Sequence, residues 1–560
     1  MSVIPSSSLP RQVADAHVDA LIELDPTFGT YLGLKESAPF LPDYSPEGHA
    51  ARAALARETL ARLDDAEKQP GADSDIERRC GRLLRERLTA ELAIHEAGED
   101  LRMVSNVRSP LHWVREAFTV MATGTEEEWA AVGQRLRAVP AALAGYRSSL
   151  ELGLERGLPG GPRATRTNID QLTEWIGTDG SWFDGFVAEA PTGLGAALGE
   201  AAGIATGALR ALRDWMRDVY LPAVADAPDT VGRERYARWV RYFNGTDLDL
   251  DEAYAYGWAE YHRLLAEMRS EAGRILPGAS PWEALAHLGV HGRHIEGVEE
   301  VRTWLQGLMD EAITALDGTH FELAAPVRRV ESRIAPPGTA AAPYYTAPSE
   351  DFSRPGLTWL PTMGATRFPV YDLVSTWYHE GVPGHHLQLA QWVHVADRLS
   401  RYQATLGMVS ANVEGWALYA ERLMDELGFL PDPERRLGYL DAQMMRACRV
   451  IVDIGMHVGM EIPADSPFRP GERWTLELVE EFFGRHSGHP AEYVASEMTR
   501  YLSMPAQAIG YKLGERAWLT GRENARAAHG DAFDAKAWHM AALSQGSLGL
   551  DDLVDELSRL

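Results

Sequence analysis

One short segment, Trp377–Gln388, limits what this chain can fold into more than any other part of the sequence. It reads Trp-Tyr-His-Glu-Gly-Val-Pro-Gly-His-His-Leu-Gln and sets His379 beside Glu380, with His385 and His386 a few residues later. Zinc hydrolases need imidazoles about 2.0–2.1 Å from the ion, a third protein ligand, and a nearby glutamate that accepts a proton from water. Because the 560 residues include only 18 histidines, three of them in so short a segment indicate a metal site.

The spacing of these histidines predicts a break in the helix that carries them. In the familiar His-Glu-x-x-His motif the two ligands share one helical face. Here His385 and His386 follow His379 at longer spacings, which on a regular helix mean about 240° of rotation or about 10 Å of rise. Pro383 lacks a backbone donor and Gly384 tolerates unusual backbone angles, so we expect a bulge or kink. If two residues loop out, His385 is the second ligand, and His386 contacts the substrate or supports a ligand; the reverse assignment stays open.

The third protein ligand is expected on a later helix. The segment Val413–Glu421 offers Glu414 and Glu421, which lie two helical turns apart and therefore on one face. We predict that Glu414 binds the metal and that Glu421 orients a histidine ligand. The alternative is a structural ion pair between a buried glutamate and Arg446 or Arg449.

The composition excludes some classes of partner. The 81 acidic and 54 basic residues give a net charge of −27, which argues against nucleic acid, because binding to phosphates needs clustered Lys and Arg. Two cysteines, Cys80 and Cys448, are too few for a disulfide framework. The N-terminal residues lack the pattern of a signal peptide, and no stretch of about 18 apolar residues occurs. We therefore expect a cytoplasmic protein with no membrane partner.

Amphipathic helices dominate the sequence pattern, so we expect a mainly α fold. One predicted helix carries large apolar side chains on a single face: Tyr254, Trp258, Tyr261, Leu265 and Met268. The turn before this helix is the best domain boundary, between an N-terminal helical region, 1–245, and a catalytic helical region, 246–560. Because no long flexible linker intervenes, we expect the two regions to pack as one body.

A change of pattern at about 327–363 predicts a small β-sheet just before the metal-binding helix. Val327–Ile334 alternates with period two, and Leu357–Leu360 is a second strand-like run. An unpaired edge of this sheet is suited to binding an extended peptide. A packing hairpin without a substrate role fits the same pattern equally well.

Four segments, taken in order, resemble bacterial proteins catalogued as domain of unknown function 885. They are His379–His386, Glu414–Glu421, Val452–His457 and Gln507–Lys512. The resemblance runs from about Asp247 to the C-terminus and, more loosely, through the N-terminal half.

More distantly, the set is similar to zinc peptidases of the gluzincin kind, in which a glutamate from a following helix is the third ligand. Glu414-Gly-Trp-Ala resembles the Glu-Gly-Phe-Ala of zinc aminopeptidases, and residues 505–514 are similar to C-terminal segments of helical oligopeptidases and Taq-type carboxypeptidases. This resemblance implies a two-lobed helical metallopeptidase-like shell around a deep channel.

Amide hydrolysis also needs a hydrogen-bond donor for the oxyanion that forms. Tyr511 is the first candidate, with Tyr501 and His457 as further candidates, although each also fits a core polar role. Arg446 and Arg500 are candidates for binding a substrate carboxylate in the bidentate manner that Arg favours, or for internal ion pairs.

These observations lead to a zinc-dependent hydrolase that cleaves an amide bond in a short peptide, with Zn²⁺ held by His379, His385 and Glu414. Glu380 accepts the water proton and passes it to the leaving amine. A non-peptide amide or modified amino acid of specialised metabolism is an alternative substrate, and an inactive binding protein on the same frame is a third reading. The intact site residues favour an enzyme.

Overall fold

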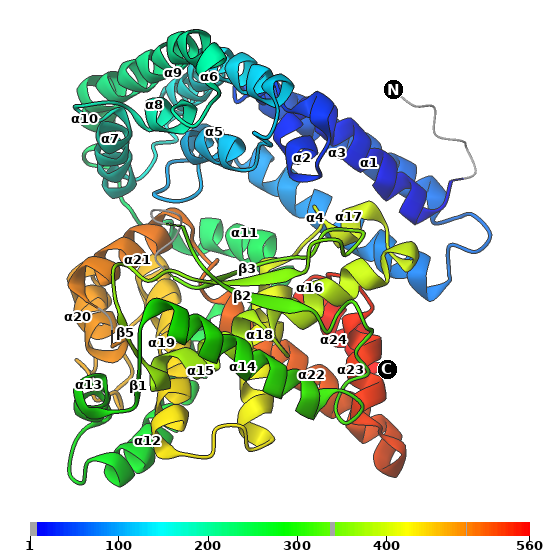
Figure 1. The fold of residues 1–560 in the computed structure, drawn as a ribbon, viewed down its shortest axis with the longest axis vertical. Helices are drawn as coiled ribbons and strands as arrows, with labels where there is room; N and C mark the ends of the chain where they lie inside the picture. The colour runs from blue at the N-terminus through cyan, green and yellow to red at the C-terminus, as the bar shows by residue number, and fades with distance from the viewer. Residues whose placement is uncertain (1–7, 337–341, 489) are drawn as a thin grey trace. The chain divides into compact units, whose positions relative to one another are not determined.

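The expected mainly α character is confirmed. The computed structural model describes residues 8–336, 342–488 and 490–560, with 68% of the chain in helices and 4% in strands (Figure 1). Most of the predicted sheet region is described, but residues 337–341 within it and the first seven residues of the chain lie outside the described part. None of the helices in the described part combines the length and apolar character needed to span a bilayer.

The chain forms two compact units, and each unit is made of segments that are not contiguous in the sequence. The first comprises Met1–Asp73, Arg87–Arg238 and Ala495–Pro505, and the second comprises Ser74–Glu86, Trp239–Val494 and Ala506–Leu560. Three helices contain a boundary between units: α4 (Asp75–Glu96), α11 (Gly232–Asn244) and α21 (Ala491–Ser503). All residues of the histidine segment belong to the second unit.

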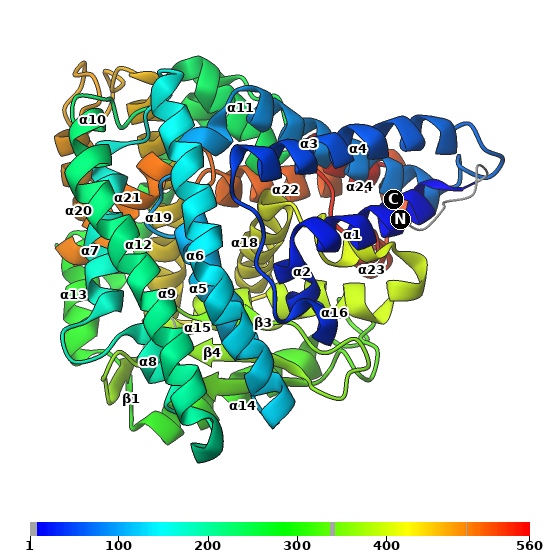
Figure 2. The same ribbon diagram turned by 90° about the horizontal axis from the view of Figure 1, so that it is seen from above.

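The first unit is an assembly of helices around its own core. In it α6 and α9 run side by side (Figure 2). Phe118, Leu136 and Tyr146 are fully buried between the helices of this unit. Its helices are α1 (Pro10–Leu24), α2 (Pro26–Tyr31), α3 (Pro46–Ala66), α5 (Pro110–Thr119), α6 (Glu126–Glu155), α7 (Pro162–Ile176), α8 (Trp182–Val187), α9 (Gly195–Trp215) and α10 (Leu221–Val224).

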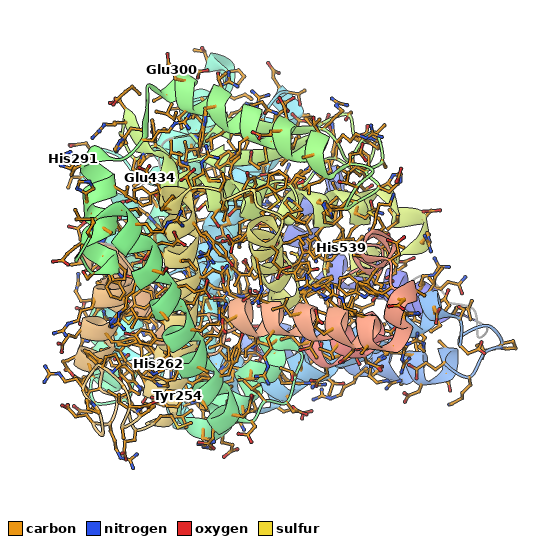
Figure 3. The ribbon with its side chains drawn as sticks, turned by 90° about the horizontal axis from the view of Figure 1, so that it is seen from below. Tyr254, His262, His291, Glu300, Glu434 and His539 are labelled. Atoms are coloured by element: carbon orange, nitrogen blue, oxygen red, sulfur yellow. The ribbon has the colours of Figure 1, made fainter. Side chains whose placement is uncertain are left out.

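The second unit is built around the packing of two long helices, α12 and α19. The five apolar residues predicted to share one face of a helix are all buried on α12, and Figure 3 labels Tyr254 and His262 along it. Its helices are α12 (Leu250–Ile275), α13 (Pro281–His291), α14 (Val298–Leu316), α15 (Val370–Glu380), α16 (His385–His394), α17 (Arg401–Ala404), α18 (Ser410–Glu426), α19 (Pro433–Val458), α20 (Leu476–His486), α22 (Gly510–His529), α23 (Ala535–Leu543) and α24 (Leu550–Ser558).

Two small sheets lie next to the helices of the histidine segment. β2 (Val330–Ile334), β4 (Gly356–Leu360) and β3 (Tyr344–Thr346) form a mixed sheet in that order, with β2 parallel and β3 antiparallel to β4. β1 (His294–Glu296) pairs with β5 (Arg367–Pro369), which leads directly into α15. Trp377 on α15 donates its indole N–H to Ser332 on β2 at 3.0 Å. The three-stranded sheet therefore supports the helix that carries His379.

The outer edge of β2 is occupied by a side chain. The Gln306 amide on α14 donates to the carbonyl oxygen of Val330 at 3.1 Å and accepts from the N–H of Ser332 at 2.8 Å. The glutamine thus replaces a neighbouring strand at this edge. The other edge of the sheet is β3, so an extended peptide added to this sheet would pair with β3.

Candidate metal centre

The helix that carries His379 stops immediately after Glu380, and the next helix begins at His385. In the loop between them the Gly384 N–H donates to the carbonyl oxygen of Tyr378 at 3.0 Å. A regular helix would join residues four apart, so this bond spans two additional residues. Pro383 has no N–H to continue the helical pattern. The loop rotates the second histidine back toward the first.

Close packing fixes the loop in this conformation. A Cβ atom on Gly384 would lie 1.9 Å from the carbonyl oxygen of His379, so only glycine fits there. The Trp416 indole on α18 donates to the carbonyl oxygens of Pro383 and Gly384, at 2.9 and 3.1 Å. Both contacts connect the loop to the helix that carries Glu414.

The helix that carries Glu414, α18, is held against α22 by two glycines. A Cβ on Gly415 would lie 2.3 Å from the carbonyl carbon of Gly514, so the two backbones approach more closely than larger residues allow. This contact fixes α18 at the residue next to Glu414. Figure 1 shows α18 beside α15, with which it packs.

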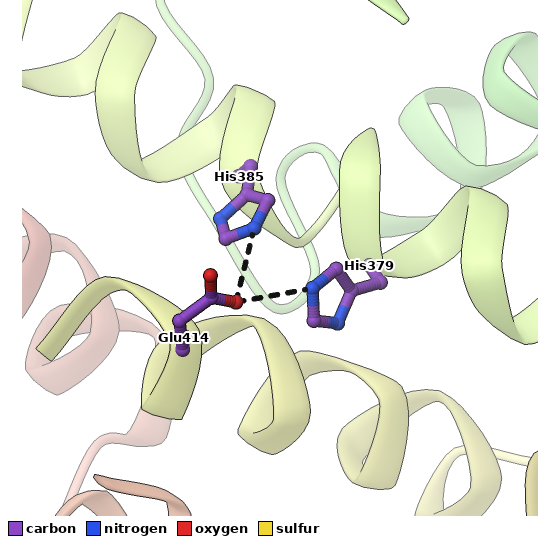
Figure 4. Close-up of side chains that lie close together, drawn as sticks. All are labelled: His379, His385 and Glu414. Atoms are coloured by element: carbon purple, nitrogen blue, oxygen red, sulfur yellow. Dashed lines mark ion pairs between the residues drawn. The ribbon is translucent and has the colours of Figure 1, made fainter. Parts of the chain in front are cut away.

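His379, His385 and Glu414 converge on one point (Figure 4). Glu414 Oε2 lies 3.5 Å from His379 Nε2 and 3.6 Å from His385 Nε2. A tetrahedral zinc ion with bonds of about 2.0–2.2 Å separates its ligand atoms by roughly 3.3–3.6 Å. Glu414 Oε2 is buried and accepts no hydrogen bond from any residue in the described ranges. Two nitrogens and one oxygen in this arrangement fit a zinc ion with an open fourth position.

The charges within this cluster stabilise one another. Burial opposes ionisation of Glu414, but the contacts with His379 and His385 hold the pKa of Glu414 well below its usual range. Burial likewise opposes protonation of His379, but the carboxylates of Glu414 and Glu421 raise the pKa of His379 to about 9. The cluster therefore favours a positive charge at its centre, and a metal ion bound there would compete with a proton for His379.

The second nitrogen of His379 is fixed by Glu421. His379 Nδ1 lies 2.8 Å from Glu421 Oε1, and the Ser375 hydroxyl donates to Glu421 Oε2 at 2.5 Å. Because the carboxylate accepts at Nδ1, His379 keeps a proton there and directs Nε2 to the cluster, where a metal ion would displace any proton on Nε2. Glu421 thus has the geometry of a residue that orients a metal ligand.

His386 points away from the cluster. Its Nδ1 lies 2.9 Å from the Tyr345 hydroxyl, and its Nε2 lies 2.7 Å from the carbonyl oxygen of Val327. The carbonyl accepts only, so Nε2 carries the proton and Nδ1 accepts the hydrogen bond from Tyr345. Burial lowers the pKa of His386 to about 4. His386 therefore joins α16 to the sheet as a neutral side chain.

Glu380 is buried at the end of α15, beside His379 in the sequence, with 8% of its surface exposed. Burial raises the pKa of Glu380, whereas the charges of His385 and His379 lower it. A raised pKa is the property that a carboxylate needs to take up a proton during a reaction near neutral pH.

Three other predicted residues of the second unit lie on neighbouring helices. Arg446 Nη2 lies 3.7 Å from Glu421 Oε1, so this guanidinium belongs to the surroundings of the cluster. His457 lies on α19 with its Nε2 3.8 Å from Asp453 Oδ1. Tyr511, on α22, has the Arg449 guanidinium over its ring at 4.9 Å. Arg446 thus contacts Glu421, the residue that orients His379.

Tyr501 and Arg500 belong to the first unit, whereas the cluster belongs to the second. The Tyr501 hydroxyl donates to Glu497 at 2.5 Å, and Arg500 forms a bidentate pair with the same carboxylate at 2.8 Å. Both side chains thus take part in a local network centred on Glu497.

Sequence reasoning missed three residues that surround the cluster. Ser375 lies one helical turn before His379, and this spacing was a usable signal. Gln443 and Lys512 come from α19 and α22, and only the packing of these helices brings them near Glu421. No local pattern marks Gln443, whereas Lys512 lies in one of the segments that carry the family resemblance.

Solved structures of other bacterial proteins share the fold of this chain. A crystal structure from Colwellia psychrerythraea, described as that of a "putative lipoprotein", is 21% identical, with a TM-score of 0.83 over 99% of each chain. A second protein, from Shewanella oneidensis and described as a "putative lipoprotein of unknown function", is 18% identical, with a TM-score of 0.75 over 99% of this chain and 100% of that one. These identities show a shared fold alone.

None of the curated proteins matches the sequence. The family model that matches covers residues 26–557 and is described as "Bacterial protein of unknown function (DUF885)". The chain belongs to this family of bacterial proteins, DUF885.

Proposed function

We propose that this protein is a zinc-dependent hydrolase that cleaves an amide bond in short peptides. The observation that carries the proposal is the convergence of His379, His385 and Glu414 beside the buried carboxylate of Glu380. The peptidase-like shell implied by the distant resemblance is part of the same proposal.

Each residue of the site has a separate role in the proposed reaction. His379, His385 and Glu414 would hold the ion, and Glu421 keeps the Nε2 lone pair of His379 available. When bound, zinc supplies a Lewis acid that polarises a carbonyl and acidifies water. Glu380 accepts the proton of the attacking water and donates it to the leaving amine.

The number of ligand atoms in the cluster supports hydrolysis over a structural role for the metal. A storage or structural zinc site closes its coordination with four protein ligands. Here the described residues contribute three converging ligand atoms, and a further buried carboxylate, Glu380, is adjacent in the sequence to the first of them. Three ligands and a base are the parts that metal-assisted hydrolysis requires.

The test is cleavage of a peptide library by the purified protein, with and without a metal chelator. We expect cleavage of short peptides that stops with chelator and returns with added zinc. Glu380→Gln should retain zinc but lose turnover by at least about 100-fold, within the range for a general base. Glu426→Gln is the matched control, because Glu426 lies on α18 with its side chain 40% exposed. Cleavage that resists chelator, or full turnover by Glu380→Gln, contradicts the proposal.

A further inference from the structure

Lys512 is a fully buried lysine on α22, with 0% of its surface exposed. An ammonium group removed from water is unfavourable unless all of its donors are paired. Its Nζ donates to Gln443 Oε1 at 3.0 Å and also to Glu515, and lies 3.0 Å from Glu260 Oε2. These three acceptors match the three N–H groups of the ammonium. The site is therefore built for a charged lysine.

The carboxylates around Lys512 behave as its partners. Burial opposes ionisation of Glu260, but a hydrogen bond from Arg263 and the charge of Lys512 lower the pKa of Glu260 to about 2. Glu260 also pairs with Arg263, and Glu515 with Arg422, so the charges around Lys512 balance without Gln443. The contact with the neutral amide of Gln443 therefore calls for another explanation than charge balance.

Lys512 determines which way the Gln443 amide faces. An ammonium group only donates hydrogen bonds, so the Gln443 oxygen must face it, and the amide nitrogen must face the opposite side. On that side the amide nitrogen lies 3.5 Å from Glu421 Oε2. Gln443 is 1% exposed, so bulk solvent has almost no access to the amide.

Glu421 connects the Gln443 amide to His379 of the metal cluster. Its Oε2 accepts from Ser375 and faces the Gln443 amide, and its Oε1 accepts from His379. A reversed Gln443 amide would place a carbonyl oxygen against this buried carboxylate. Two acceptors facing each other without a proton are repulsive, and the carboxylate would lose a donor.

We propose that Lys512 is a positioning residue for the metal centre, acting through Gln443 to keep Glu421 aligned on His379. The inference rests on the proposed metal site, since it concerns how tightly that site holds its ion. It goes beyond that site by assigning a role to Lys512, which is connected to Glu421 through two hydrogen bonds by way of Gln443.

The experiment measures zinc affinity by competition with a chromophoric chelator. Wild-type protein is measured first, because a wild type without zinc affinity overturns the proposed function and this inference together. With zinc binding established, Lys512→Met and Gln443→Met should each weaken zinc binding about tenfold, the lower end of the effect of residues that support a ligand. The double variant should be no weaker than Gln443→Met, because both substitutions remove the same coupling.

The Arg436→Met variant is a control that distinguishes the positioning role proposed for Lys512 from a purely structural role. Arg436 on α19 also pairs with several carboxylates, at 2.7 Å from Glu267, 2.9 Å from Glu271 and 3.1 Å from Asp425. These pairs join α19 to α12 and α18, and their carboxylates are not those that contact His379. We expect this variant to unfold at lower temperature with unchanged zinc affinity.

Three results would overturn the inference while leaving the metal site in place. One is unchanged zinc affinity in Gln443→Met, which keeps the pairs of Lys512 with Glu260 and Glu515 and so tests the idea even if Lys512→Met fails to fold. Another is an equal loss of affinity in Arg436→Met. The third is an additive loss in the double variant.

Discussion

The indole N–H of Trp416 donates to the carbonyl oxygen of Gly384 at 3.1 Å, which ties the loop between the two histidine ligands to the helix of the third ligand. Trp416 follows Glu414 by two residues on α18. Together with the contact to Pro383, this bond links the position of the loop to that of the Glu414 carboxylate.

Gly384→Ala should therefore disrupt zinc binding. The added Cβ would lie 1.9 Å from the carbonyl oxygen of His379, so the loop must move and carry His385 with it. We expect a loss of zinc affinity of about 10- to 100-fold or more, because misplacing a ligand exceeds the effect of losing a supporting residue. Gly203→Ala is the control: it lies within α9 with open space around it and should be neutral or stabilise the helix by about 0.5–1 kcal/mol. Equal zinc affinity in both variants would contradict the role of the loop.

The two adjacent histidines should respond differently to substitution. His385→Asn removes a converging ligand atom, so we expect zinc binding to be lost. His386→Asn breaks the contacts with Tyr345 and Val327, so we expect a loss of about 1–3 kcal/mol in the free energy of unfolding with zinc still bound. Zinc titration and urea unfolding of both variants provide the measurement. Loss of zinc from His386→Asn alone would reverse the assignment.

Glu421→Gln should weaken zinc binding by about 10- to 100-fold, as for other residues that orient a histidine ligand. The substitution keeps the shape of the side chain but removes the charge that Glu421 Oε1 presents to His379 Nδ1 at 2.8 Å. Isothermal titration with zinc measures the change. An affinity equal to that of wild type would show that His379 is held by packing alone.

Buried histidines outside the cluster should make the protein sensitive to acid. Burial lowers the pKa of His17, His112 and His486 to about 4 in each case, compared with about 6.5 in an unfolded chain. Below pH 6.5 the unfolded state binds protons that the folded state does not, so stability falls as the pH drops toward 4. Each group contributes up to about 1.4 kcal/mol per pH unit in that window.

Urea unfolding at pH 7 and pH 5 tests this acid dependence. The unfolding midpoint of the wild type should be lower at pH 5, and His17→Gln should show a smaller difference between the two pH values. A wild-type midpoint that is the same at both pH values would contradict the assignment of these histidines as buried and neutral.

Local patterns in the sequence predict the helices and the small sheet. The apolar stripe that begins at Tyr254 is buried on α12, because helical periodicity follows directly from which side faces the core. β2 forms only the second part of the alternating segment Val327–Ile334, and Leu357–Leu360 makes up most of β4. Local patterns do not predict which segments belong to each unit. Ser74–Glu86 belongs to the second unit and Ala495–Pro505 to the first because of long-range packing that no local pattern encodes.

The spacing around Pro383 predicts a break in the helix, because proline and glycine change the backbone within a few residues. The contacts from Glu421 to Gln443 and on to Lys512 were not predictable, because they need side chains from three different helices at atomic separations. Zinc, hydrolysis and the expected cytoplasmic location stay predictions.

The most direct test of the central claim is an anomalous diffraction map at the zinc absorption edge, from crystals of protein loaded with zinc. The account predicts one strong peak within about 2.0–2.2 Å of His379 Nε2, His385 Nε2 and a Glu414 carboxylate oxygen. A map with no peak among these three side chains, or with zinc bound only elsewhere, would contradict it.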